Sequence, residues 1–208
     1  MSDERPLNKR QQQAAETRER VLQAATRVFE ERGYRATTVG AITAAADTAH
    51  GTFYLYFKNK DDALVHVVET VGDELVRSVS SAYSDDPWEM CRGSLLAFLQ
   101  IFQDHGGLWT TLLEGSFHSP VIYERWEASR RRYIEGIAQS IEKQQELGGL
   151  ELVDAKQAAV ALGSMAEWYA FTYLVLGSLN DEGATAEEAV DTLAALWYRA
   201  MFGHTDRD

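Results

Sequence analysis

Residues 33–57 read GYRATTVGAITAAADTAHGTFYLYF, and this stretch decides the fold. Thr38 offers a hydroxyl N-cap ahead of an apolar run, which predicts a short helix over residues 38–46. Residues 47–49 break the pattern, and a second short helix is expected over residues 49–56. Two short helices joined by about three residues have the geometry of a helix-turn-helix.

The residues before this stretch predict one longer helix. Its apolar positions recur with helical spacing at Val21, Leu22, Ala25, Val28 and Phe29. Gly33 favours a helix end, because glycine adopts the left-handed conformation without strain, so we expect the helix to cover residues 14–32. Residues 1–13 are polar and contain Pro6, and they are expected to form a disordered tail.

The rest of the chain repeats helix-start and helix-end signals. Capping residues are expected to begin helices at Asn59, Asp86, Ser119, Asp154 and Thr185. A shorter helix fits residues 108–115. The helix that begins at Ser119 is expected to end near Leu147, just before two glycines, and the helix that begins at Thr185 is expected to end near Gly203. Alternating strand patterns are absent. We therefore predict an all-α fold of about nine helices, with a helix-turn-helix domain over residues 14–58 and a larger helical domain over residues 59–208.

The stretch also resembles the signature of the TetR family of transcriptional regulators. The matching positions are Gly33, Thr37, Thr38, Val39, Ile42, Ala46, Gly51, Thr52, Tyr54, Tyr56, Phe57 and Lys60. The resemblance implies a dimer that binds operator DNA and is released by a small-molecule effector held among the later helices. The sequence departs from the family pattern at Asp47, Ala49 and His50, which bears on operator affinity more than on the fold.

The second short helix has an unusual composition for a surface helix. A solvated face usually carries Lys, Glu or Gln, whereas this one carries tyrosines, hydroxyls and an imidazole. Such side chains can meet base edges, thymine methyl groups and phosphates, and a glycine lets the backbone approach a groove wall. We predict DNA contacts by Thr37, Thr38, His50, Gly51, Thr52, Tyr54, Leu55, Tyr56 and Lys60.

The second domain is rich in large aromatic residues. Tryptophan and tyrosine are rigid and carry a polar tip, so they are typical of apolar pockets that need a few hydrogen bonds. We predict a cavity for a small hydrophobic effector that is lined by Phe98, Phe102, Trp109, Trp126, Tyr133, Met165, Trp168, Tyr169 and Thr172.

The last two helices are expected to form a homodimer interface. Small residues in one helix permit close approach, and an apolar stripe runs along the other. The predicted interface residues are Ala158, Ala161, Leu162, Val190, Leu193, Trp197 and Met201. A dimer is also required for DNA reading, because two reading helices must reach half-sites about 34–36 Å apart.

Composition excludes several other classes of protein. The net charge is −12, yet residues 1–60 hold ten basic and seven acidic side chains, so the acidity lies in the second domain. The single cysteine, Cys91, rules out a disulfide framework, and no apolar run is long enough for a membrane span, so we expect a cytoplasmic protein. No metal-binding histidine pair, phosphate loop or nucleophile motif is found, so we expect no enzyme activity, metal or cofactor. The alternative left open is a TetR-like small-molecule-binding protein with weak or lost DNA binding.

Overall fold

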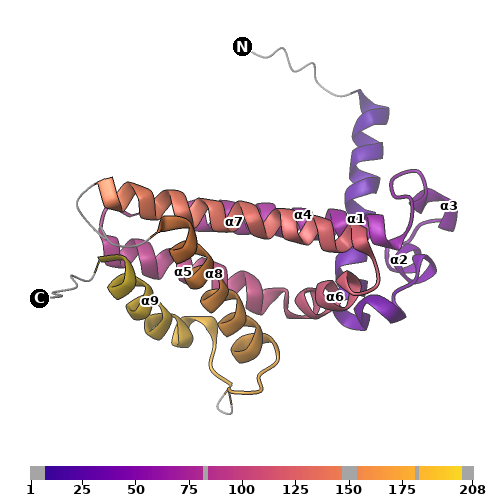
Figure 1. Cartoon of the computed structure of the whole chain (residues 1–208). Coiled ribbons are helices and arrows are strands. Elements are labelled where there is room, and N and C mark those ends of the chain that lie inside the picture. Colours follow the sequence, from indigo (N-terminus) through magenta and orange to yellow (C-terminus); the bar gives the residue numbers. More distant parts are fainter. Residues whose placement is uncertain (1–7, 82–83, 147–153, 181–182, 203–208) are drawn as a thin grey trace, which may run out of the picture.

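The computed structural model describes residues 8–81, 84–146, 154–180 and 183–202, and these residues are almost entirely helical (Figure 1). The helices are α1 Lys9–Ala36, α2 Val39–Ala45, α3 His50–Phe53, α4 Lys60–Ser81, α5 Pro87–Asp104, α6 Gly106–Ser116, α7 Pro120–Glu146, α8 Ala155–Tyr169 and α9 Ala186–Phe202. A π-helical turn, η1 Ala170–Val175, continues α8. The predicted all-α architecture with nine helices is confirmed within the described residues.

Most helix starts follow the capping chemistry of the sequence. Asp86 and Asp154 accept hydrogen bonds from the backbone N–H groups of Glu89 and Gln157, and Pro87 occupies the first turn of α5. Before α9, the Glu188 carboxylate accepts hydrogen bonds from the N–H and the hydroxyl of Thr185. Local sequence therefore sets where these helices begin.

Three helix boundaries differ from the prediction by several residues. Helix α1 begins at Lys9, five residues early, because Asn8 and Gln11 form a capping box, so residues 9–13 are not a disordered tail. At Gly33 the backbone has φ 73°, and this kink separates the long part of α1 from a final turn that ends at Ala36. Helix α3 ends at Phe53, because residues 54–56 form turns rather than helix.

The interior consists of two apolar clusters. The first joins the buried faces of α1–α4 to residues of α5, α6 and α7, including Phe29, Phe53 and Leu112. The second joins α5, α7, α8 and α9. Leu75 of α4 and Trp109 of α6 pack against both clusters and link them. The helix-turn-helix is therefore packed onto the second domain rather than tethered by a linker.

Helix α6 packs against the end of α1 with an unusually short distance between the two backbones. A Cβ atom built on Gly107 would overlap the backbone of Glu30. The buried Thr111 hydroxyl donates a hydrogen bond of 2.8 Å to the carbonyl oxygen of Phe29. Only a glycine at position 107 allows this backbone-to-backbone approach.

This close approach predicts a large cost for one added methyl group. Gly107→Ala must push α6 away from α1, so we expect the free energy of unfolding to fall by about 1–3 kcal/mol in urea denaturation. The control is Gly136→Ala in α7, where a Cβ would meet nothing within 4 Å; it should gain about 0.5–1 kcal/mol from the better helix propensity of alanine. Equal stability of the two variants would show that α1 and α6 are not held in close contact.

Candidate functional site

The two short helices are joined by a tight turn at Asp47. Its backbone has a φ of 49°, in the left-handed region that aspartate tolerates better than most residues. The N–H groups of Asp47 and Thr48 donate to the carbonyl oxygens of Ala44 and Thr43. Thr38 caps α2 as predicted, accepting a hydrogen bond of 3.1 Å from the N–H of Ala41. The turn thus keeps helix-turn-helix geometry with an aspartate at this position.

Helix α3 and the turn after it divide into an inner and an outer face. Phe53 and Phe57 lie fully inside the first cluster. Tyr54 is 52% exposed and Leu55 75% exposed, and the region lies at one end of the molecule (Figure 1). Gly51 has open space where a Cβ would stand. This end presents apolar and aromatic groups to solvent on a short, well-anchored element, which marks a contact surface.

The other predicted members of this surface vary in exposure. His50 and Thr38 are exposed, whereas Thr52 and Tyr56 are half-buried. The rings of His50 and Tyr54 lie 5.4 Å apart. Lys58, which sequence reasoning did not select, is exposed beside the surface and has no side-chain ion pair among the described residues.

Thr37 and Lys60 have roles inside the protein. Thr37 is only 1% exposed, and its hydroxyl donates to the carbonyl oxygen of Gly33 at 2.7 Å. The ammonium of Lys60 donates to the carbonyl oxygens of Tyr34 at 2.8 Å and Thr37 at 3.3 Å, and it lies over the Tyr34 ring. These contacts fix the connection between α1 and α2. They leave the buried Thr37 hydroxyl no access to DNA, which corrects that prediction, whereas a DNA contact by the half-buried Lys60 stays a prediction.

A cavity of about 400 Å³ lies where the two apolar clusters meet. It receives Val68 and Leu112 from the first cluster and Phe98 and Phe102 from the second. Its volume falls within the range of about 300–1,000 Å³ typical of small-molecule sites. A molecule bound here would therefore touch both halves of the interior.

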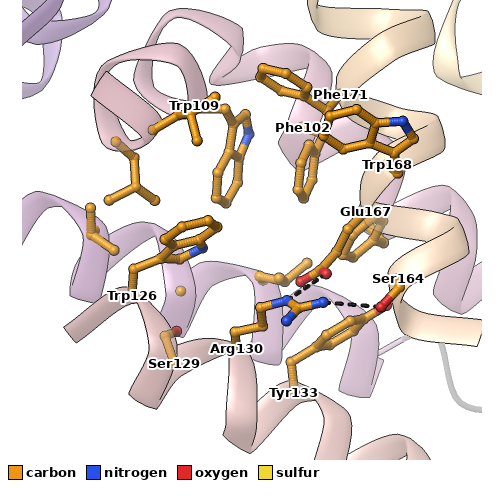
Figure 2. Close-up of a pocket in the computed structure, with 16 residues that line it drawn as sticks. Phe102, Trp109, Trp126, Ser129, Arg130, Tyr133, Ser164, Glu167, Trp168 and Phe171 are labelled. Atoms are coloured by element: carbon orange, nitrogen blue, oxygen red, sulfur yellow. Dashed lines mark hydrogen bonds and ion pairs between the residues drawn. The ribbon is translucent and has the colours of Figure 1, made fainter. Parts of the chain in front are cut away.

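Six of the nine predicted lining residues face this cavity. They are Phe98, Phe102, Trp109, Trp126, Tyr133 and Trp168, several of which are visible in Figure 2. Met165, Tyr169 and Thr172 do not line it, which corrects the prediction. The residues from α8 and η1 that do are Ser164, Glu167, Trp168 and Phe171. Met165, Tyr169 and Thr172 each follow a lining residue by one position, which turns their side chains about 100° around the helix.

Four of the predicted dimer residues are buried inside one protomer. Val190, Leu193, Trp197 and Met201 are at most 8% exposed, and they pack in the second cluster, where α9 lies against α5. The apolar stripe of α9 is thus core, which corrects the prediction. The other predicted positions remain on or near the surface of α8: Ala161 is exposed, and Ala158 and Leu162 are half-buried.

Comparison with known proteins assigns both parts of the chain. Residues 21–67 match the family described as bacterial regulatory proteins, tetR family. Residues 91–203, more than half of the chain, match the C-terminal domain of the transcriptional regulator EthR. The chain belongs to the TetR family of transcriptional regulators.

Curated relatives of this TetR-family protein match either most of its length or about half of it. The HTH-type transcriptional regulator EthR of Mycolicibacterium smegmatis is 24% identical over 193 residues, covering 88% of this chain and 85% of that protein. The regulator TtgR of Pseudomonas putida is 32% identical over 101 residues, 47% of each chain. A TetR-family regulator from Syntrophomonas wolfei has the same fold, with a TM-score of 0.76, 21% identity and coverage of 93% and 99%. The protein is thus a DNA-binding regulator, and its described helices include none suited to crossing a membrane.

A polar cluster interrupts the aromatic lining of this regulator's cavity. The Nε of Arg130 donates to Oε2 of Glu167 at 2.7 Å, and its Nη2 donates to Oγ of Ser164 at 3.0 Å (Figure 2). Burial raises the pKa of Glu167 above its ordinary value, although the hydrogen bond from Arg130 opposes the shift. Burial, reinforced by the charge of Glu167, also raises the pKa of Tyr133, so its hydroxyl stays neutral. Sequence reasoning missed Arg130, Glu167 and Ser164.

The raised pKa of Glu167 predicts a pH dependence of stability. The folded state binds this proton more tightly than the unfolded state, so stability is lost as the pH rises above the ordinary glutamate value of 4.5. Glu167→Gln removes that loss. Its free energy of unfolding relative to the native protein should therefore increase from about pH 4 to about pH 7.

The control for this measurement is Glu188→Gln, because hydrogen bonds from Thr185 lower the pKa of Glu188. Stability from Glu188 is present above its ordinary pKa and lost on acidification. Its glutamine variant should therefore show the opposite slope in urea denaturation at a series of pH values. A Glu167→Gln difference that stays constant with pH would contradict the account of the cavity wall.

Proposed function

We propose that this protein is a ligand-responsive transcriptional repressor, which binds operator DNA as a homodimer and leaves it when a small hydrophobic effector fills the cavity. The observation that carries the proposal is the outward face at α3. Tyr54 and Leu55 are exposed there, while Phe53 and Phe57 anchor the same segment in the core. A regulator of this kind acts on DNA in the cytoplasm.

The exposed face at α3 supplies contacts to the DNA bases and contacts to the DNA phosphates. Gly51, Tyr54 and Leu55, which are exposed, and the half-buried Thr52 are the residues proposed to meet base edges and thymine methyl groups in the major groove. The hydroxyl groups of Thr38 and Tyr56 and the imidazole of His50 are suited to phosphate oxygens, and the exposed Lys58 adds a cation beside them. The buried face of this segment thus fixes the position of the reading helix, and the side chains of its outer face determine which DNA sequence it binds.

A dimer is proposed because one short reading helix covers only a half-site. Exposed apolar groups on the last two helices support this: Val160 of α8 is 47% exposed and Leu196 of α9 51% exposed. Ala161, also exposed, permits close approach of a second copy. These residues lie on the exposed sides of α8 and α9, outside the buried stripe.

The proposed release is a shift between two conformations. The cavity contains Val68, Gly72 and Leu75 of α4, and α4 begins directly after the reading segment. An effector that binds better to one spacing of α4, α6 and α7 favours that spacing. The distance between the two reading helices then no longer matches successive turns of the groove.

Ala49 favours one alternative, a cavity-binding protein that has lost strong DNA binding. It precedes α3 without a side-chain hydrogen bond to cap the helix, so the reading element lacks one stabilising contact. A direct measurement of DNA affinity separates the two functions.

That measurement compares two leucines of nearly equal exposure. Leu55→Asp replaces an apolar contact with a carboxylate at the negatively charged DNA surface, so fluorescence anisotropy with DNA from upstream of its own gene should show at least about tenfold weaker binding. Leu179→Asp, at a leucine that is 71% exposed in the loop before α9, should bind like the native protein. Native affinity should fall steeply with salt through counterion release. Equal affinities for the two variants, or no DNA binding by the native chain, would favour the alternative.

The dimer is tested at Leu196. Leu196→Glu introduces a charge into the proposed interface, so sedimentation velocity should show a shift from dimer to monomer at micromolar concentration. Val121→Glu, at a valine of similar exposure in α7, should remain dimeric. A dimer that survives Leu196→Glu would place the interface on another face.

A further inference from the structure

The polar cluster on the cavity wall has hydrogen-bonding capacity left over. Arg130 uses Nε and Nη2, and Glu167 uses Oε2. Neither Nη1 of Arg130 nor Oε1 of Glu167 has a hydrogen-bond partner among the residues that the structure describes. Both side chains line the cavity and are about a quarter to a third exposed, so a bound molecule can reach a free donor and a free acceptor at neighbouring points.

The charges of this cluster select against ionised ligands. A carboxylate drawn to Arg130 would lie beside the carboxylate of Glu167, 2.7 Å from the guanidinium. A cation drawn to Glu167 would lie beside Arg130. Either ligand must weaken a partly buried ion pair, which leaves one of its members uncompensated. The raised pKa of Glu167 agrees with a wall that accepts no further negative charge.

The remaining walls are flat and aromatic. The rings of Phe102 and Trp109 are stacked with centroids 4.1 Å apart and planes 9° apart. The rings of Phe98 and Tyr133 are stacked at 5.2 Å. Trp168 and Phe171 lie near them around the space in Figure 2. Such faces fit a planar apolar body better than a flexible chain.

We propose that the effector is an uncharged aryl compound with one carboxamide-like group, whose N–H donates to Glu167 while its carbonyl oxygen accepts from Arg130. This inference rests on the proposed function, because it names the chemical class that the regulatory cavity takes. Ser164 holds the guanidinium in place for this contact, since it accepts the second hydrogen bond of Arg130. Arg130 and Glu167 thus act as a pair that reads a donor next to an acceptor.

The test uses three probes of the same shape and different charge: naphthalene-2-carboxamide, naphthalene-2-carboxylate and naphthalene-2-carboxamidine. Binding to the full native chain is measured by quenching of tryptophan fluorescence at neutral pH, since Trp109, Trp126 and Trp168 line the cavity. The carboxamide should bind at least about tenfold more tightly than either ion.

Two variants then change the preference in opposite directions. Glu167→Gln frees Arg130 from its ion pair, so the carboxylate should become the preferred probe. Arg130→Gln leaves Glu167 without its cation, so the carboxamidine should become preferred. Glu135→Gln, on the exposed side of α7 and away from the cavity lining, should keep the native preference.

The outcomes separate this inference from the proposed function. Equal binding of the three probes, no binding of the carboxamide, or an unchanged preference in both variants would overturn it, and Arg130–Glu167 would then only tie α7 to α8. The same native preparation is titrated with upstream DNA. If the native protein binds DNA but shows no preference among the probes, the proposed effector class is rejected and the repressor function is retained. If it prefers the carboxamide but does not bind DNA, the repressor function is rejected and the proposed cavity chemistry is retained.

Discussion

The contact between α1 and α6 is the constraint on which the rest of this molecule depends. Gly107 brings the backbone of α6 against that of Glu30, and Thr111 adds a buried hydrogen bond to Phe29. At the start of α6, Nδ1 of His105 lies 2.7 Å from Oε1 of Glu30. One face of α6 therefore packs tightly against α1, the helix that supports the helix-turn-helix. Because Trp109, Leu112 and Leu113 of the same helix line the cavity, α6 connects the cavity wall to α1.

The sequence specified the DNA-reading half closely, because its signals are local. Thr38 caps α2, Asp47 makes the turn, and Phe53 and Phe57 face inward. The errors arose where a side chain has two uses. Thr37 matches the family signature, yet its hydroxyl turns inward to the carbonyl oxygen of Gly33. A motif shows which residues are needed and leaves open whether they read DNA or hold the turn.

The second domain was harder to predict, because helical periodicity shows that a face is buried without showing what buries it. The stripe that includes Val190 and Trp197 was assigned to a second copy, whereas α5 of the same chain covers it. In α8 and η1 the prediction placed Trp168 in the cavity correctly, whereas Met165, Tyr169 and Thr172 lie one position, or about 100°, away from lining residues. Arg130 and Glu167 were missed, because isolated charged residues on an amphipathic helix look like a solvated face. Their pairing across α7 and α8 is a long-range contact.

The central claim is that the state of the cavity controls DNA binding, and it can be tested before any effector is known. Leu113→Trp would fill the cavity from α6 with a side chain in place of a ligand. The decisive measurement is the affinity of this variant for upstream DNA by fluorescence anisotropy, together with a crystal structure that shows where the indole lies. The account predicts at least about tenfold weaker DNA binding by a folded, dimeric protein. If Leu113→Trp binds DNA as tightly as the native protein while its crystal structure shows the indole inside the cavity, the claim is contradicted.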